Sequence, residues 1–298
     1  MPPSKVPENY LPKHKRPLKV LTLEGDGLQG IAQMMILKEL LAKLAYERGS
    51  PGMILRPCDV FDVICGIGGG GCLALLLGRL QLGSDRALSE WERIGDTCER
   101  GNGDKPSRIN KTKFEEVVRS IVQRTHAGDK LKDTSAAQKT CRHTSLSNGF
   151  PNQQNINEIA AWEIWALYGG AENVRNSIFV NNGPGPPHNS EIRKILGVHS
   201  WSKIPSTNFD RQVHPEGSVK KFQFIPDESV KGAIFGEDAV RLEVRNATSA
   251  WLSKHKVADT LEKCAHEMVF LESNGYLPPP SPPPPYTSSD TKKSFQDE

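Results

Sequence analysis

Apolar and polar positions along the chain alternate in a way that predicts strands and helices in turn. Residues 18–24 (LKVLTLE) form a short apolar run that ends in glycines, as expected of a buried strand followed by a turn. Residues 59–65 (DVFDVIC) repeat this plan, and residues 72–80 (CLALLLGRL) are apolar on nearly every side, as in a buried helix. Two successive strand, glycine-turn, helix units predict an α/β protein with a mainly parallel sheet covered on both faces.

Further helices are predicted where apolar residues recur at steps of three and four. The helical sets are Ile31, Met34, Leu37, Leu41 and Leu44; Phe114, Val117, Val118, Ile121 and Val122; the segment 156–168; and Val257, Leu261, Cys264, Met268 and Val269. Ser84 is the expected N-cap of another helix, and residues 177–180 (SIFV) are a short strand. Residues 125–154 are polar without a period, so the pattern leaves their structure open.

Composition divides the 298 residues into one folded body and two tails. Residues 1–16 are basic and are expected to be a disordered lead-in, and residues 17–276 are expected to form the domain. Residues 277–298 are expected to be a disordered proline-rich tail, because seven prolines within residues 278–285 favour an extended chain that cannot join a packed core.

Charge and cysteine usage narrow the function. A net charge of +3 without a basic stripe gives no indication of nucleic-acid binding. No apolar run is long enough to cross a bilayer, and the first 20 residues lack the apolar centre of a signal peptide, so we expect a cytoplasmic protein. Six cysteines without a C-x-x-C pair predict reduced thiols, and no metal site or cofactor is expected.

Both glycine turns match G-x-G-x-x-G, which makes dinucleotide binding one hypothesis. The glycines are Gly25, Gly27 and Gly30 in the first turn and Gly66, Gly68 and Gly71 in the second. A dinucleotide site also needs an acidic residue at the end of the following strand. Asp85 has the right distance from the second turn but lies at a predicted helix start, so this hypothesis is the third of three.

Taken together, the turns resemble those of the patatin-like phospholipases, in particular their fungal and cytosolic members. The family's oxyanion motif D-G-G-G-x-R-G corresponds to EGDGLQG at 24–30, and its elbow G-T-S-T-G-G corresponds to GIGGGG at 66–71. The segments at 161–171 (AWEIWALYGGA) and 179–185 (FVNNGPG) are similar to I-W-E-A-A-R-A-T-S-A-A and F-V-D-G-G-L-G. The resemblance implies a three-layer α/β/α fold and a Ser-Asp dyad that hydrolyses lipid esters.

The residues that would perform this chemistry are changed. Gly68 stands at the serine position between Gly66 and Gly70, and Asn181, or Asn182 if the loop is registered one residue later, stands at the aspartate position. In the oxyanion turn, which also contains Gly25, Gly27 and Gly30, Asp26 replaces a glycine and Gln29 replaces the arginine. Asparagine cannot take a proton from a nucleophile at neutral pH. Loss of a nucleophile alone costs about a million-fold in rate.

We therefore expect a catalytically inactive, patatin-like domain, a pseudoenzyme that binds lipid or another protein. The alternative is a residual lipid acyl hydrolase with a noncanonical nucleophile, for which Cys65, Cys72 and Thr22 lie closest to the turns. A lipid or membrane surface is the expected ligand. Tail residues Pro282–Tyr286 (PPPPY) fit ligands of WW and SH3 domains. In fungi, patatin-like domains stand at the N-terminus of proteins that resemble NOD-like receptors, and this chain is similar to such a module.

Overall fold

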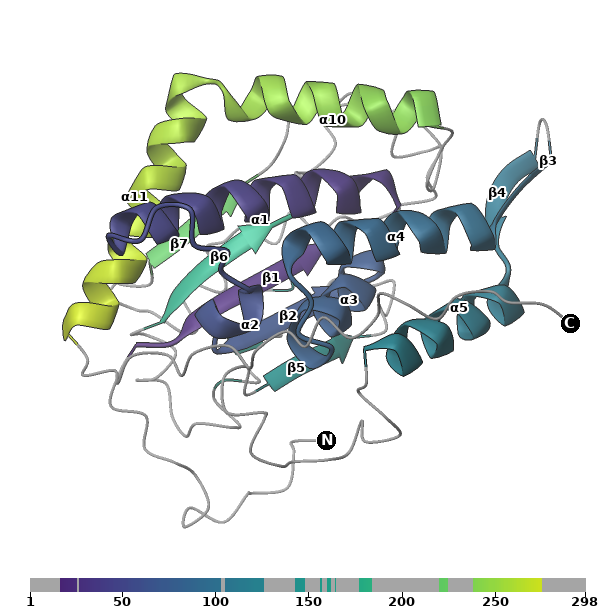
Figure 1. Ribbon diagram of the computed structural model, residues 1–298, viewed down its shortest axis with the longest axis horizontal. Coiled ribbons are helices and arrows are strands. Elements are labelled where there is room, and N and C mark those ends of the chain that lie inside the picture. Colours follow the sequence, from purple (N-terminus) through teal and green to yellow (C-terminus); the bar gives the residue numbers. More distant parts are fainter. Residues whose placement is uncertain are drawn as a thin grey trace, which may run out of the picture.

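A parallel sheet of five strands runs through the protein (Figure 1) in the order β5-β2-β1-β6-β7. The computed structural model describes residues 17–25, 27–102, 105–125, 143–147, 156, 160, 161, 164, 177–183, 220–224 and 238–274. The strands are β1 (Lys19–Glu24), β2 (Val63–Ile67), β5 (His143–Ser147), β6 (Ile178–Asn182) and β7 (Lys220–Phe224). A separate antiparallel hairpin consists of β3 (Glu99–Asn102) and β4 (Lys105–Ile109).

Both faces of the sheet are buried, as the central strand β1 shows. Leu21 and Leu23 point to a large cluster that includes the helices drawn above the sheet in Figure 1. Leu18 and Val20 point to a second cluster, which contains Ile156, Ala160, Ala161 and Ile164 from a helical segment on the opposite face. Helices on both faces of a parallel sheet make three layers, and the predicted α/β class is confirmed.

The upper layer is centred on α1 (Leu28–Glu47), which contacts α4, α10 and α11. The remaining helical elements are α2 (Pro57–Val60), α3 (Gly69–Ala74), the π-helical turn η2 (Leu75–Arg79), α4 (Ser84–Cys98), α5 (Lys111–Arg124), α10 (Asp238–Leu252) and α11 (His255–Asn274). No helix in the described ranges is long and apolar enough to cross a bilayer.

Most predicted elements are present, with two boundaries wrong. Helix α4 begins at Ser84, which is therefore its first residue and not its N-cap. The apolar segment 59–65 does not start as a strand, because Pro57 opens the short helix α2 and the strand begins only at Val63. Residues 143–147 within the polar segment form the edge strand β5. The predicted tails at 1–16 and 277–298 lie outside the described residues, as do most of 125–154 and 156–168.

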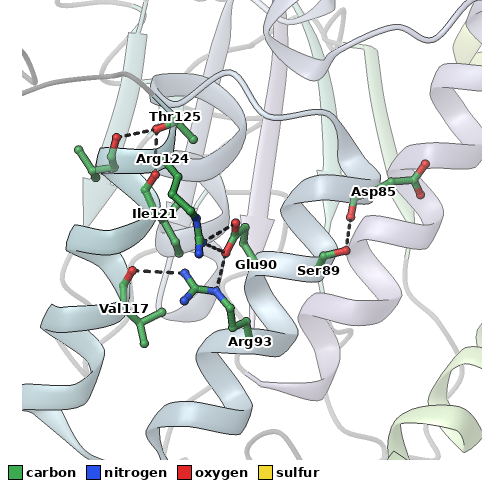
Figure 2. A network of polar contacts seen from close by, with 9 residues as sticks. Asp85, Ser89, Glu90, Arg93, Val117, Ile121, Arg124 and Thr125 are labelled. Carbon is green, nitrogen blue, oxygen red and sulfur yellow. Dashed lines mark hydrogen bonds and ion pairs between the residues drawn. The ribbon is translucent and has the colours of Figure 1, made fainter. Parts of the chain in front are cut away.

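Two ionic clusters join distant parts of the upper layer. Buried Lys19 of β1 forms an ion pair with Glu272 of α11, which also binds Arg48 just after α1. Buried Glu90 of α4 accepts hydrogen bonds from Arg124 of α5 at 2.8 and 2.9 Å and from Arg93 at 2.8 Å. Figure 2 shows the Glu90 carboxylate in contact with both guanidinium groups, and these bonds hold α4 and α5 together.

Candidate functional site

The carboxyl ends of β1, β2 and β6 meet at one edge of the sheet, and this edge holds both glycine turns. In the parallel register, Glu24 lies opposite Ile67, and Leu23 lies opposite Asn182. Strand β1 lies between the other two strands. Ligands of open α/β sheets bind at this edge, outside the carboxyl ends of the strands, so this edge is the candidate site.

The second turn has the backbone of a hydrolase elbow. Gly68 connects β2 to α3 with φ 63° and ψ −133°, a conformation that side-chain-bearing residues avoid. Gly68 is exposed, although Gly66 and Gly70 on either side are buried. A strained strand-to-helix turn of this kind holds the nucleophile of G-x-S-x-G enzymes above the sheet. Here the exposed position has no side chain.

Gly66 and Gly70 are required by close packing. A Cβ atom on Gly66 would collide with the backbone carbonyl group of Gly70, and a Cβ atom on Gly70 would collide with the carbonyl group of Leu23 in β1. Helix α3 therefore starts directly against the ends of β1 and β2. Both glycines belong to the predicted elbow, and at each position the neighbouring backbone leaves no room for a Cβ atom.

The two glycine turns are joined through their main chains. The amide nitrogen of Gly70 donates a hydrogen bond of 2.9 Å to the carbonyl oxygen of Gly25. In the first turn, the indole nitrogen of Trp91 donates a hydrogen bond of 2.8 Å to the carbonyl oxygen of Gly27. A Cβ atom on Gly30 would overlap this indole ring. The turns thus form one unit, and Trp91 is a positioning residue that the sequence did not reveal.

Two further members of the predicted oxyanion turn bear on its chemistry. Gln29 is half-buried in the first turn of α1, and Asp26 lies outside the described residues. Helix α1 begins here with no side-chain cap on its N-terminal amides and no acidic residue in its first turn. The amide nitrogen of Gly30 in this first turn donates a hydrogen bond of 3.0 Å to the carbonyl oxygen of Gly27.

Asn181 lies in a polar row that crosses the sheet. Its Cα is in register with that of Thr22, which is in register with Cys65 on β2. Alternation along the strands places these three side chains on the face of Leu18 and Val20. Asn181, which the sequence resemblance places at the base position, is 8% exposed. An amide there keeps the shape of a carboxylate but accepts no proton.

Asn182 points to the opposite face and has a different task. Its side-chain nitrogen donates a hydrogen bond of 2.7 Å to the backbone carbonyl group of Gln33 in α1. The Gln33 side chain in turn donates to the backbone carbonyl group of Glu24. These bonds fix the end of β1 between α1 and β6. Asn182 therefore holds β6 against α1, whereas Asn181 lies on the opposite face of the sheet.

Glu24 is the titratable side chain at the centre of this edge. Its Cβ atom and the Oδ1 atom of Asn181 each lie 3.1 Å from the place where a Cβ on Gly183 would be. Burial raises the pKa of the Glu24 carboxyl group to about 7. No side chain in the described ranges forms a hydrogen bond or an ion pair with this carboxyl group. The sequence signal was present, because a carboxylate ends the buried strand segment directly before the first glycine turn.

The substitute nucleophiles proposed from the sequence are poorly placed. Cys65 and Thr22 are fully buried in the sheet. Burial, with a smaller contribution from Cys98, raises the pKa of the Cys72 thiol to about 12, which keeps it protonated at neutral pH. For the dinucleotide hypothesis, the strand that follows the first turn is β2, which ends in Gly66 and Ile67 without an acidic residue.

The fold and the edge define an α/β protein with two glycine turns at the carboxyl edge of its parallel sheet, the second of which has no side chain at its exposed position, Gly68. Comparison with known proteins gives a relationship over part of the chain. The chain is 35% identical to patatin-like phospholipase 1 of Plasmodium falciparum over 72 residues. This stretch covers 24% of the chain and 10% of that protein. The chain is 42% identical to phospholipase A I of Arabidopsis thaliana over 81 residues. This stretch covers 27% of the chain and 6% of that protein. No protein-family model matches the chain. The similarity to patatin-like phospholipases is therefore coarse, and the chain spans a tenth or less of these relatives' lengths.

Proposed function

We propose that this protein is a patatin-like domain that binds acyl lipids and does not hydrolyse them. The observation that carries the proposal is the conformation of Gly68, whose φ of 63° and ψ of −133° keep the elbow shape with no nucleophile on it. Asn181 at the base position supports the same conclusion, because neither half of a Ser-Asp dyad is present. The partial similarity to two phospholipases supports a lipid ester as the ligand class.

The proposal includes the organisation expected from the sequence. Residues 17–276 form the domain, and the protein acts in the cytoplasm at a lipid or membrane surface as a sensing or interaction module. Pro282–Tyr286 offers a ligand for WW or SH3 domains, so that lipid binding and protein binding use separate parts of the chain. A kinship with fungal proteins that resemble NOD-like receptors would place such a module in signalling.

A binding assay and a turnover assay on the same preparation test this function. The full chain is mixed with a monomeric short-chain phosphatidylcholine, and both heat release on binding and fatty acid release are measured. We expect saturable binding with fatty acid release at the buffer rate. Turnover that survives repurification and that is lost in Gly66→Ala would overturn the inactive assignment, and absence of binding would overturn the lipid ligand.

A matched glycine pair controls for damage to the fold. A Cβ at Gly66 collides with the backbone of Gly70, whereas a Cβ at Gly83 meets no atom within 4 Å. Gly66→Ala is therefore expected to displace the elbow and weaken lipid binding at least tenfold, and Gly83→Ala is expected to bind as the wild type does. Far-ultraviolet circular dichroism confirms that both variants keep the helices.

A further inference from the structure

The group of interest is Glu24, the first residue of the segment that resembles the oxyanion motif and not a member of the Ser-Asp dyad. The order β2-β1-β6 places the strand that ends in Glu24 between the strand that leads to Gly68 and the strand that carries Asn181. Glu24 is in register with Ile67, the residue directly before Gly68. A lipid ester group that occupied the emptied dyad would thus lie over the end of β1.

The side chain of Glu24 leaves β1 on the same face as that of Asn181. Leu18 and Val20 alternate with Leu21 and Leu23 between the two clusters, and Glu24 continues the first series. The shared contact point beside Gly183, 3.1 Å from Glu24 Cβ and from Asn181 Oδ1, places the two side chains next to each other. Glu24 and Asn181 therefore lie beside the same point at the carboxyl end of the sheet.

The buried surroundings of Glu24, and not a neighbouring charge, favour its neutral form. Strand β6 contains no titratable residue, β2 contributes the buried Cys65 thiol, and α3 contributes Cys72. In α1 the first charged residue is Lys38, which forms an ion pair with Asp85. Among the described residues of β6, β2, α3 and α1, none therefore places a cation beside Glu24. A protonated carboxyl group is a hydrogen-bond donor.

We propose that Glu24 recognises the ester or carboxyl carbonyl of the acyl ligand by donating a hydrogen bond from its protonated carboxyl group, with the Asn181 amide as the second donor. This inference rests on the proposed lipid-binding function and names the chemistry of that site. Binding then becomes sensitive to pH, because ionised Glu24 has no proton to donate.

Calorimetric titration of the full chain with a dihexanoyl phosphatidylcholine at pH 6 and pH 8 tests the inference. With a Glu24 pKa of about 7, the donor fraction falls about tenfold between these pH values, so the wild type is expected to bind the diester about tenfold more weakly at pH 8. A diether analogue, which has no carbonyl group, is expected to bind more weakly at pH 6 and to show no pH dependence.

Two variants separate hydrogen bonding from packing. Glu24→Gln keeps a neutral donor and is expected to bind the diester equally at both pH values. Glu24→Ala is expected to lose most of the affinity at both, and Glu115→Gln, an exposed carboxyl change on α5, is expected to behave as the wild type does.

The outcomes distinguish this inference from the proposed function. If wild type and Glu24→Ala bind the diester equally, or if affinity rises with pH, the role of Glu24 is wrong while lipid binding stands. If the wild type binds neither phospholipid at either pH, the proposed function itself is wrong and this inference falls with it.

Discussion

The indole nitrogen of Trp91 in α4 donates a hydrogen bond of 2.8 Å to the carbonyl oxygen of Gly27 at the start of α1. The same ring fills the space beside Gly30, where a Cβ would overlap it. A residue 64 positions away in the chain therefore fixes the main chain of the first glycine turn.

Trp91→Phe is expected to lower the free energy of unfolding by about 1 kcal/mol, because it removes one buried hydrogen bond. Gly30→Ala is expected to lower the free energy of unfolding strongly in the wild type. In the Trp91→Phe background it is expected to lower this free energy clearly less, because the smaller ring leaves room for the new Cβ. Urea unfolding of both single variants and the double variant measures this coupling. Equal costs of Gly30→Ala in the two backgrounds would contradict the contact.

Glu24 gives the protein a stability term that depends on pH. Its pKa in the folded protein is about 7, above its ordinary value of 4.5, because burial disfavours the charged form. The folded state thus holds this proton more tightly than the unfolded chain does. The resulting stabilisation is fully present below pH 4.5 and is lost as the pH rises through 7.

Glu24→Gln removes this dependence. The difference in free energy of unfolding between the variant and the wild type is expected to shift in favour of the variant by on the order of 2–3 kcal/mol as the pH rises from 4.5 to 8. Urea unfolding of both proteins across this range measures the difference, in which all other titrating groups cancel. A constant difference would show that the Glu24 carboxyl group ionises normally in the folded state.

Restoring the dyad alone is expected to give little activity. Gly68→Ser with Asn181→Asp supplies the missing groups, but Asp26 and Gln29 remain in the oxyanion turn, where a carboxylate opposes a developing negative charge. Adding Asp26→Gly and Gln29→Arg is expected to raise ester hydrolysis by a further factor of roughly 10²–10³. Fatty acid release from a short-chain phospholipid measures each step, and full activity in the double variant would show that the turn was never impaired.

Loss of Glu272 alone is expected to lower the free energy of unfolding more than loss of both Lys19 and Glu272. Glu272→Ala leaves the buried Lys19 ammonium group unpaired, which costs about 3–5 kcal/mol. Adding Lys19→Met removes the charge as well and is expected to recover most of that loss. Thermal or urea unfolding of the three variants tests this, and additive losses would show that Lys19 gains nothing from Glu272.

The sequence predicted the elements in which apolar residues either recur at regular steps or fill the whole segment. Strands β1 and β6 are apolar because both of their faces are covered, and the glycines of both turns were visible as motifs. Helix α10 was missed because two of its four buried residues are polar, Arg241 and Thr248, which leaves too thin an apolar stripe. Strand β5 (HTSLS) was left open because it lies at the sheet edge and is polar.

The candidate site could be predicted by position but not by its interactions. Gly68 and Asn181 were identified from motif spacing, and the structure brings their strands to one edge on either side of β1. Trp91 could not be assigned, since its contact with Gly27 depends on how α4 packs against α1. The pKa of Glu24 likewise depends on burial by neighbouring strands and helices, which no local pattern encodes.

The hydrogen bond from the Gly70 amide to the Gly25 carbonyl group uses main-chain atoms alone. Side chains at positions 68 and 181 can therefore be exchanged without cutting the link that aligns the two turns. In this protein, main-chain atoms fix the shape of the two turns, whereas side chains would determine whether the site reacts. Such a scaffold can be fitted with a new reactive group, or left without one, while its shape stays the same.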